Sequence, residues 1–118
     1  MKTPPRTMAA LITPFNDQGL IDETAHRYNL GKLTEWGLEG FLIGGSTGQG
    51  PYLEPRERGL LTSTARGELG PSAFLLTGIS AQSVRQAEQQ ITEAADAEAD
   101  AVLVTTPTLL LRKDATLV

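Results

Sequence analysis

The residues most able to do chemistry lie in one glycine-rich segment, Gly44-Gly45-Ser46-Thr47-Gly48-Gln49-Gly50-Pro51. Glycines let backbone N–H groups approach a ligand closely and tolerate positive φ. Successive exposed N–H groups make a concavity that attracts anions, and Ser46 and Thr47 add two hydroxyl donors. The segment therefore suits a carboxylate or a phosphate group on a small ligand.

Two common phosphate-binding motifs can be tested against this segment. The Walker pattern GxxxxGK[ST] aligns Gly45 and Gly50, but Pro51 stands where the pattern requires lysine. The dinucleotide pattern GxGxxG finds no register in the segment. A nucleotide site is therefore not predicted. Two alternatives stay open from the local sequence, namely a flavodoxin-like phosphate site and a glycine-rich turn without a ligand.

The elements that must position this segment follow from four short apolar runs separated by helical periodicity. Near-continuous apolar runs are typical of parallel strands that are buried on both faces. Asp22 and either Ser80 or Ser83 are predicted to cap the first and third helices, and Gly70-Pro71 is predicted to end the second. The predicted strands cover 8–12, 40–43, 73–76 and 101–104, and the predicted helices cover 24–36, 55–69 and 83–99.

The alternation of strands and helices, with a period of about 30 residues, predicts an α/β fold with a parallel sheet. Such a sheet is either doubly wound or closed into a (β/α)8 TIM barrel. A barrel needs about 250 residues, so 118 residues supply about half of one. Residues 113–118 read as the opening of a fourth helix. The chain is therefore predicted to be the N-terminal half of a single, truncated TIM-barrel domain spanning 1–118, with about four strands and three helices.

Composition narrows the class of partner. The formal net charge of −4 disfavours nucleic acid. The chain has no cysteine, which fits a cytoplasmic protein. The residues after Met1 contain no apolar stretch long enough for a signal peptide or a membrane span. No cluster of His, Asp and Glu has the spacing of metal ligands. We therefore expect a small-molecule ligand, and no metal, membrane or nucleic acid.

Several segments, in order along nearly the whole chain, resemble the dihydrodipicolinate synthase/N-acetylneuraminate lyase family of class I aldolases. The first strand ends in Ile12-Thr13-Pro14-Phe15, as the family's opening strand does. The loop Gly45-Ser46-Thr47-Gly48 and the helix start Leu53-Glu54-Pro55-Arg56-Glu57-Arg58 are similar to those of the family. Thr77-Gly78-Ile79 and the strand end Thr105-Thr106-Pro107 resemble the family's third and fourth loops.

The resemblance implies a TIM barrel in which a lysine forms a Schiff base with pyruvate or a related 2-oxo acid. That lysine would end the sixth strand, and a proton-relaying tyrosine would end the fifth. The loop would bind the substrate carboxylate through Ser46 and Thr47, flanked by Gly45 and Gly48. The family's mechanism needs no cofactor and no metal, and the resemblance suggests a homo-oligomer.

The sequence also departs from the family pattern. The three lysines, Lys2, Lys32 and Lys113, and the two tyrosines, Tyr28 and Tyr52, all stand outside the expected catalytic positions. We therefore assign no catalytic residue within this chain.

Two further departures bear on the substrate. Thr108-Leu109 replaces the tyrosine pair that the synthase branch has after the fourth strand. Gly48-Gln49-Gly50-Pro51 looks more like relatives that cleave or dehydrate 2-keto-3-deoxy sugar acids.

The predicted function is thus that of a Schiff-base lyase, aldolase or dehydratase acting on pyruvate or a 2-keto-3-deoxy sugar acid. The alternative is a non-catalytic half-barrel that serves as a binding or assembly module. His26 and Trp36 are predicted to have structural roles in packing, and Glu54 to pair with Arg58. The acidic residues Glu93, Asp96, Glu98 and Asp100 are predicted to form a solvated face.

Overall fold

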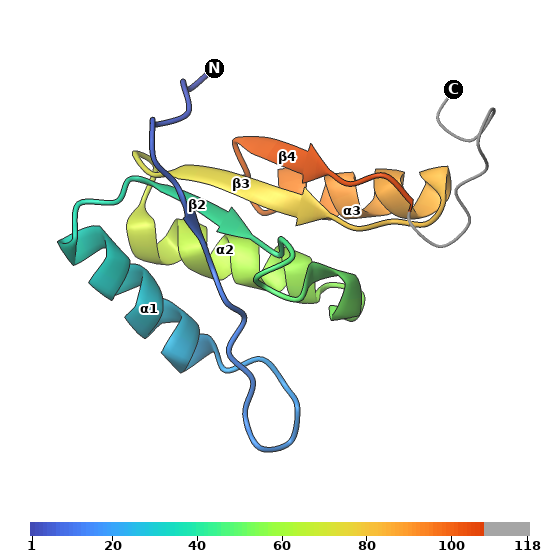
Figure 1. The fold of residues 1–118 in the computed structure, drawn as a ribbon, viewed down its shortest axis with the longest axis horizontal. Coiled ribbons are helices and arrows are strands. Elements are labelled where there is room, and N and C mark those ends of the chain that lie inside the picture. The colour runs from blue at the N-terminus through green and yellow to red at the C-terminus, as the bar shows by residue number, and fades with distance from the viewer. Residues whose placement is uncertain (108–118) are drawn as a thin grey trace.

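The computed structural model describes residues 1–107 and shows a four-stranded sheet with three α-helices over that range (Figure 1). Each predicted strand and helix is present, with ends that differ by a few residues. The predicted fourth helix at 113–118 lies outside the described residues. The strands are β1 (Ala9–Ala10), β2 (Gly40–Ile43), β3 (Phe74–Ile79) and β4 (Ala101–Val104); the helices are α1 (Glu23–Glu35), α2 (Glu57–Leu69), α3 (Val84–Asp96) and the short 3₁₀ helix η1 (Gly50–Tyr52).

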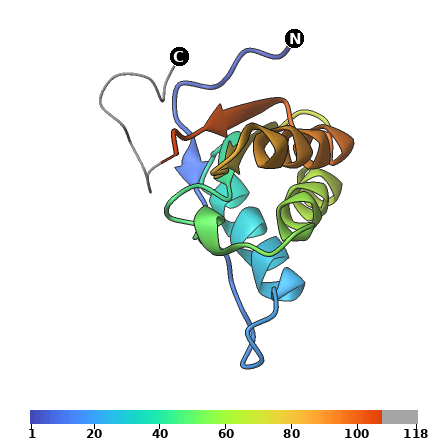
Figure 2. The ribbon, with the colours of Figure 1, turned by 90° about the vertical axis from the view of Figure 1, so that its right-hand side faces the viewer.

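The sheet is parallel throughout, and its strands follow the order β1-β2-β3-β4. The three α-helices lie on one side of it (Figure 2). A doubly wound sheet carries helices on both faces, whereas a (β/α)8 barrel keeps them outside a closed sheet. The described residues therefore form part of a (β/α)8 barrel, as predicted. No helix within residues 1–107 is long and apolar enough to cross a lipid bilayer.

The helix ends follow largely from local side chains. The Asp22 carboxylate accepts the Ala25 N–H at 2.9 Å, and the Ser83 hydroxyl accepts the Gln86 N–H at 3.2 Å. Both residues are the predicted N-caps. Gly70 ends α2 with a φ of +72°. The second helix begins later than predicted, at Glu57 rather than in a turn containing Pro55, because Arg56 takes a left-handed conformation with a φ of +74°.

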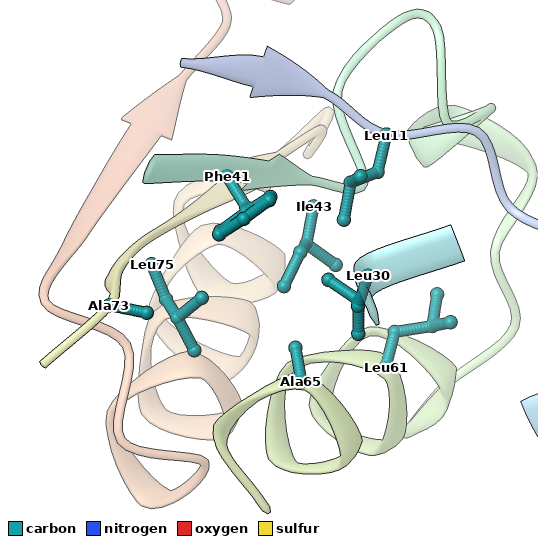
Figure 3. Packing of buried hydrophobic residues seen from close by; sticks show 8 residues of the cluster. All are labelled: Leu11, Leu30, Phe41, Ile43, Leu61, Ala65, Ala73 and Leu75. Atoms are coloured by element: carbon teal, nitrogen blue, oxygen red, sulfur yellow. The ribbon is translucent and has the colours of Figure 1, made fainter. Parts of the chain in front are cut away.

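The main core lies between the sheet and helices α1 and α2 (Figure 3). A smaller cluster joins Ile79 of β3 to Ala81 and to Ala94 of α3. The removal of these apolar side chains from water is the main driving force that holds the helices against the sheet. The main core consists of Leu11, Leu30, Phe41, Ile43, Leu61, Ala65, Ala73 and Leu75.

The opposite face of the sheet is less covered. Leu42 of β2 pairs in register with Ala10 and with Leu76 of β3, and Leu42 and Leu76 are only half-buried. Burial on both faces was predicted for every strand. It is wrong for the outer strands, because Ala10 of β1 is exposed and Val104 of β4 is more than half exposed. Among residues 1–107, β1 and β4 each have a neighbour on one side only.

Helix α1 buries only a narrow stripe of side chains. His26 and Leu30 are buried, whereas Tyr28 is 65% exposed and Trp36 is 75% exposed. Trp36 was predicted to pack against the barrel; its ring lies beside the edge strand but stays largely exposed. Both aromatic rings lie beside the open edge of β1, where they line a shallow hollow with residues 9–12. The stripe that faces α2 is set by the spacing of His26, Leu30 and Leu33.

The only histidine of the chain is a packing residue, as predicted. His26 is 1% exposed, and its Nε2 lies 3.1 Å from the Leu61 carbonyl oxygen of α2. A carbonyl only accepts, so Nε2 carries the proton. Within the described residues, Nδ1 is buried without a partner. Burial lowers the pKa of His26, although the bond to Leu61 opposes this shift.

A charged network at the amino ends of the strands joins distant segments. Asp100 accepts bonds from Arg66 at 2.8 Å, from Lys2 at 2.9 Å and from the Leu75 N–H at 2.9 Å. Burial would raise the pKa of Asp100, but these three bonds outweigh it and hold the pKa below its usual value. Asp100 was predicted to belong to a solvated acidic face. That is wrong, because Asp100 follows the end of α3 and its side chain is only 15% exposed.

We expect acid to destabilise the fold through His26. Burial lowers the pKa of His26 in the folded chain. Below the ordinary histidine pKa, the unfolded chain therefore binds a proton at this residue that the folded chain does not yet bind. The free energy of unfolding should therefore fall by up to about 1.4 kcal/mol per pH unit as the pH drops below about 6.5. Urea denaturation between pH 7.5 and pH 5 measures this slope. His26→Gln can still donate to Leu61 and should flatten the slope; an unchanged slope in that variant would contradict the assignment.

We expect Asp100→Asn to lower the free energy of unfolding by about 1.5–3 kcal/mol, the range for a hydrogen bond to a charged group. The amide oxygen can still accept from Leu75, so the loss reports on the charge that Arg66 and Lys2 share. The matched control is Glu35→Gln, because the Lys32–Glu35 pair is exposed and should contribute less than about 0.5 kcal/mol. Equal losses in the two variants would mean that the network adds nothing beyond a surface pair.

Candidate carboxylate-binding site

The glycine-rich segment forms a compact loop at the carboxyl end of β2, the edge of a parallel sheet where ligands bind. The loop closes on itself, because the Gly50 N–H donates to the Gly45 carbonyl at 3.0 Å and the Gln49 N–H donates to Ser46 at 3.1 Å. Two residues need positive φ, namely Gly44 at +66° and Gln49 at +56°. The closed turn brings Ser46, Thr47 and Gly48 to its tip.

The tip of the loop carries donors that the protein itself does not use. Ser46 and Thr47 are both exposed. Among residues 1–107, the N–H groups of Ser46, Thr47 and Gly48 meet no hydrogen-bond acceptor, and the two hydroxyls form no hydrogen bond. Three consecutive free N–H groups beside two hydroxyls are the arrangement expected of an anion site.

The flanking glycines differ in how strictly the backbone requires them. Gly48 is buried, and its carbonyl accepts the Thr13 hydroxyl at 2.6 Å, which ties the loop to the end of the first strand. A Cβ at Gly48 would lie 2.8 Å from the Leu11 carbonyl oxygen, too close for any side chain. A Cβ at Gly45 would meet only the flexible end of Leu42. Gly48 is thus the position that tolerates no side chain.

The closest packing at this edge of the sheet is between backbones. A Cβ on either Gly50 or Gly78 would collide with the Gly44 carbonyl group. The loop after β2 and the end of β3 therefore touch without side chains between them. The run Thr77-Gly78-Ile79 carried this signal in the sequence, because glycine inside a strand marks a close approach of another backbone.

Arg58 is the residue at the site that sequence reasoning missed. It is 3% exposed, and its Nη2 donates to the Gly50 carbonyl at 2.8 Å while its Nε donates to the Gly78 carbonyl at 2.6 Å. The predicted pair with Glu54 is wrong: Arg58 turns inward, and the Glu57 carboxylate accepts the Glu54 backbone N–H instead. Burial lowers the pKa of Arg58, and the charge of Glu93 opposes that shift.

Arg58 also borders a polar cleft of about 320 Å³ between the start of α2 and the helix α3. Its polar lining includes glutamine side chains of α3 and the carboxylates of Glu54 and Glu93. Neither Ser46 nor Thr47 belongs to that cleft. The predicted carboxylate site therefore lies on the outer surface of the loop, apart from this polar cleft.

The two lysines within residues 1–107 stand far from the loop along the fold. Lys2 donates to Asp100 and to the Ala73 carbonyl at the amino ends of the strands. Lys32 bonds Glu35 on α1, and this bond raises its pKa, which keeps the amine protonated and a poor nucleophile. Lys113 lies outside the described residues. Residues 1–107 also contain no group of three His, Asp or Glu side chains that could hold a metal ion.

Comparison with known proteins gives one consistent family. The chain is 34% identical over 102 residues to the 4-hydroxy-tetrahydrodipicolinate synthase of Prochlorococcus marinus, covering 86% of this chain and 34% of that enzyme. The enzyme of the same name from Methanothermobacter thermautotrophicus is 33% identical over 101 residues, covering 86% and 36%. A crystal structure of a putative dihydrodipicolinate synthase family protein from Coccidioides immitis superposes with a TM-score of 0.82 at 30% identity, covering 88% and 35%.

These relatives are longer, and the chain spans about a third of their length. The similarity nevertheless runs through almost all of this chain, because the model of the dihydrodipicolinate synthetase family matches residues 3–115. That range holds all four strands, the three helices and the glycine-rich loop. The chain belongs to the dihydrodipicolinate synthetase family.

Proposed function

We propose that this chain supplies the carboxylate-binding part of a Schiff-base lyase that acts on a 2-oxo acid. The single observation that carries the proposal is the loop tip, where the free N–H groups of Ser46, Thr47 and Gly48 adjoin two free hydroxyls within the described residues. Their place at the carboxyl edge of a partial (β/α)8 barrel supports it, because that edge carries the active site in such barrels.

The chemistry that this loop serves is covalent. A lysine amine condenses with the keto group of the substrate, water leaves, and the resulting iminium withdraws electrons from the adjacent carbon. The substrate carboxylate keeps its negative charge throughout, and preorganised donors hold it beside the reacting carbon. The family resemblance assigns the lysine and a proton-relaying tyrosine to the sixth and fifth strands of the barrel, beyond the residues of this chain.

The choice of substrate rests on the residues that follow the loop tip. Gln49, Gly50 and Pro51 favour a 2-keto-3-deoxy sugar acid over the substrates of the synthase branch, with pyruvate as the common fragment. We place the protein in the cytoplasm, supported by the absence of cysteine. We also expect a homo-oligomer, supported by the family resemblance. No cofactor enters the proposal, since an iminium is itself the electron sink.

A second candidate function is that of a non-catalytic assembly module. The observation that favours it is the open sheet, in which β1 and β4 have one partner each within residues 1–107 and Ile12, Leu103 and Val104 are exposed. Unpaired strand edges and uncovered apolar faces promote association. Analytical ultracentrifugation of the 118-residue chain, read together with the pyruvate titration below, separates the two candidates, since the assembly function requires a defined oligomer that does not bind a carboxylate.

We expect pyruvate to shift the amide resonances of Ser46, Thr47 and Gly48 in an NMR titration of the 118-residue chain. Thr47→Val should weaken this binding by about tenfold, because it removes a hydroxyl that donates to a charged group. Thr92→Val is the matched control, since Thr92 is an exposed threonine of α3 whose hydroxyl donates to the Glu88 carbonyl. Equal affinity in both variants would remove the loop from the site, and tighter binding of inorganic phosphate would favour the phosphate-site alternative.

We expect no covalent adduct when the same chain is treated with pyruvate and borohydride and its intact mass is measured. Lys2 and Lys32 bond carboxylates away from the loop, and Lys113 stands outside the expected catalytic position in the sequence, so no lysine of this chain is expected to condense with a bound ketone. A stable pyruvyl adduct on this chain would contradict the assignment of the catalytic lysine to a position outside it.

A further inference from the structure

We propose that Arg58 is a positioning residue that holds the 44–50 loop in its anion-binding shape. The inference deepens the proposed function of that loop and rests on it. Arg58 touches no part of the loop tip itself. It acts through the carbonyl groups of Gly50 and Gly78, to which its guanidinium donates.

The charge of Arg58 stands in an unfavourable place for stability alone. Within residues 1–107 no carboxylate forms an ion pair with it, although the charge of Glu93 acts on it from the same cleft, and its side chain is nearly fully buried. It lies in the first turn of α2, where the helix dipole already presents positive charge. A buried cation without an ionic partner costs free energy. A neutral side chain would avoid both costs, so the guanidinium needs a reason beyond packing.

The reason lies in what its two bonds join. Gly50 closes the loop by donating its N–H to Gly45, while Gly78 belongs to β3. A guanidinium is a planar, rigid fork of donors, so bonding both carbonyls fixes their separation as well as their direction. Arg58 therefore anchors the closing residue of the loop to a central strand of the sheet.

The same bonds help to set the polarity of the loop. The Gly45, Ser46 and Gly48 carbonyls accept from Gly50, Gln49 and Thr13. With Gly50 bonded to Arg58, each of these four carbonyls is occupied inside the protein. The lone pairs of these four carbonyls are thereby used inside the protein, whereas the N–H groups of residues 46–48 have no partner among residues 1–107. A buried positive charge behind the loop favours an anion in front of it.

Arg66 provides a control within the same helix. Its side chain is 11% exposed and donates to the backbone carbonyls of Gly70, Ala73 and Glu98 as well as to Asp100. These partners lie toward the opposite end of α2 from the loop. Arg66→Met thus removes a largely buried arginine that also bonds backbone carbonyls, and it adds the loss of the Asp100 pair without touching the proposed site.

The test compares Arg58→Met with Arg66→Met in the 118-residue chain, using ¹⁵N relaxation of the amides of Ser46, Thr47 and Gly48 and an NMR titration with pyruvate. We expect both variants to lose stability, but only Arg58→Met to lower the loop order parameters from about 0.85 to below about 0.6. Pyruvate affinity should fall by about tenfold in Arg58→Met alone, because the binding shape is no longer preorganised.

Three outcomes test the positioning role of Arg58 separately from the proposed carboxylate-binding function of the loop. A loop that stays ordered in Arg58→Met, with a loss of stability like that of Arg66→Met, overturns the positioning role. Loop disorder in Arg58→Met without pyruvate binding to any variant upholds the positioning role and refutes the proposed function. If Arg58→Met does not fold, Arg58→Lys keeps the charge and lacks the planar fork; an ordered loop in that variant overturns the proposal.

Discussion

The structure depends on a contact between backbones at the carboxyl edge of the sheet. The Gly44 carbonyl lies so close to Gly50 and Gly78 that neither position can carry a side chain. This contact lets the loop after β2 fold back against β3 instead of extending into solvent. The tip that carries Ser46 and Thr47 takes its position from that fold. The candidate anion site is thereby made largely of main-chain atoms, whose geometry the sheet fixes.

A buried or largely buried arginine near each end of α2 bonds a different edge of the sheet. Arg66, at one end, belongs to an ionic network with Asp100 and Lys2 that ties distant segments together. Arg58, at the other end, bonds only carbonyl groups among residues 1–107. In (β/α)8 folds, the amino face of the barrel serves stability and the carboxyl face serves chemistry. Arg66 stabilises the amino face, and Arg58 has its proposed positioning role at the carboxyl face.

The elements were predictable because their signals are local. The apolar run at 40–43 coincides with β2, and Asp22 and Ser83 cap the helices that they precede. The third strand runs to Ile79, beyond its predicted end at residue 76. The prediction ended there because Thr77 and Gly78 are not apolar. The Thr77 hydroxyl pairs with that of Thr62 at 3.1 Å, and Gly78 leaves room for another backbone.

The site was predictable only in part. The glycines and hydroxyl residues of the sequence predicted the loop, and the structure places Gly45, Ser46, Thr47 and Gly48 in one turn. Arg58 could not be foreseen, because its partners are carbonyl groups 8 and 20 residues away in the sequence. A carbonyl belongs to every residue and leaves no trace in the pattern of side chains. The exposure of Trp36 was equally hidden, since it depends on how α1 packs beside β1 and not on local spacing.

The sheet has a further consequence for the way in which this chain loosens. Each strand pairs with the strand of the preceding or following unit, and each helix packs mainly against its sequence neighbours. Protection of the backbone amides against exchange with deuterium should therefore form a gradient along the chain. The inner strands β2 and β3 would exchange last, through global unfolding, while β1 and β4 would exchange early by fraying. The loop at 44–50 directly follows β2, one of the slow-exchanging strands. The proposed ligand would therefore bind at one of the most rigid parts of the chain.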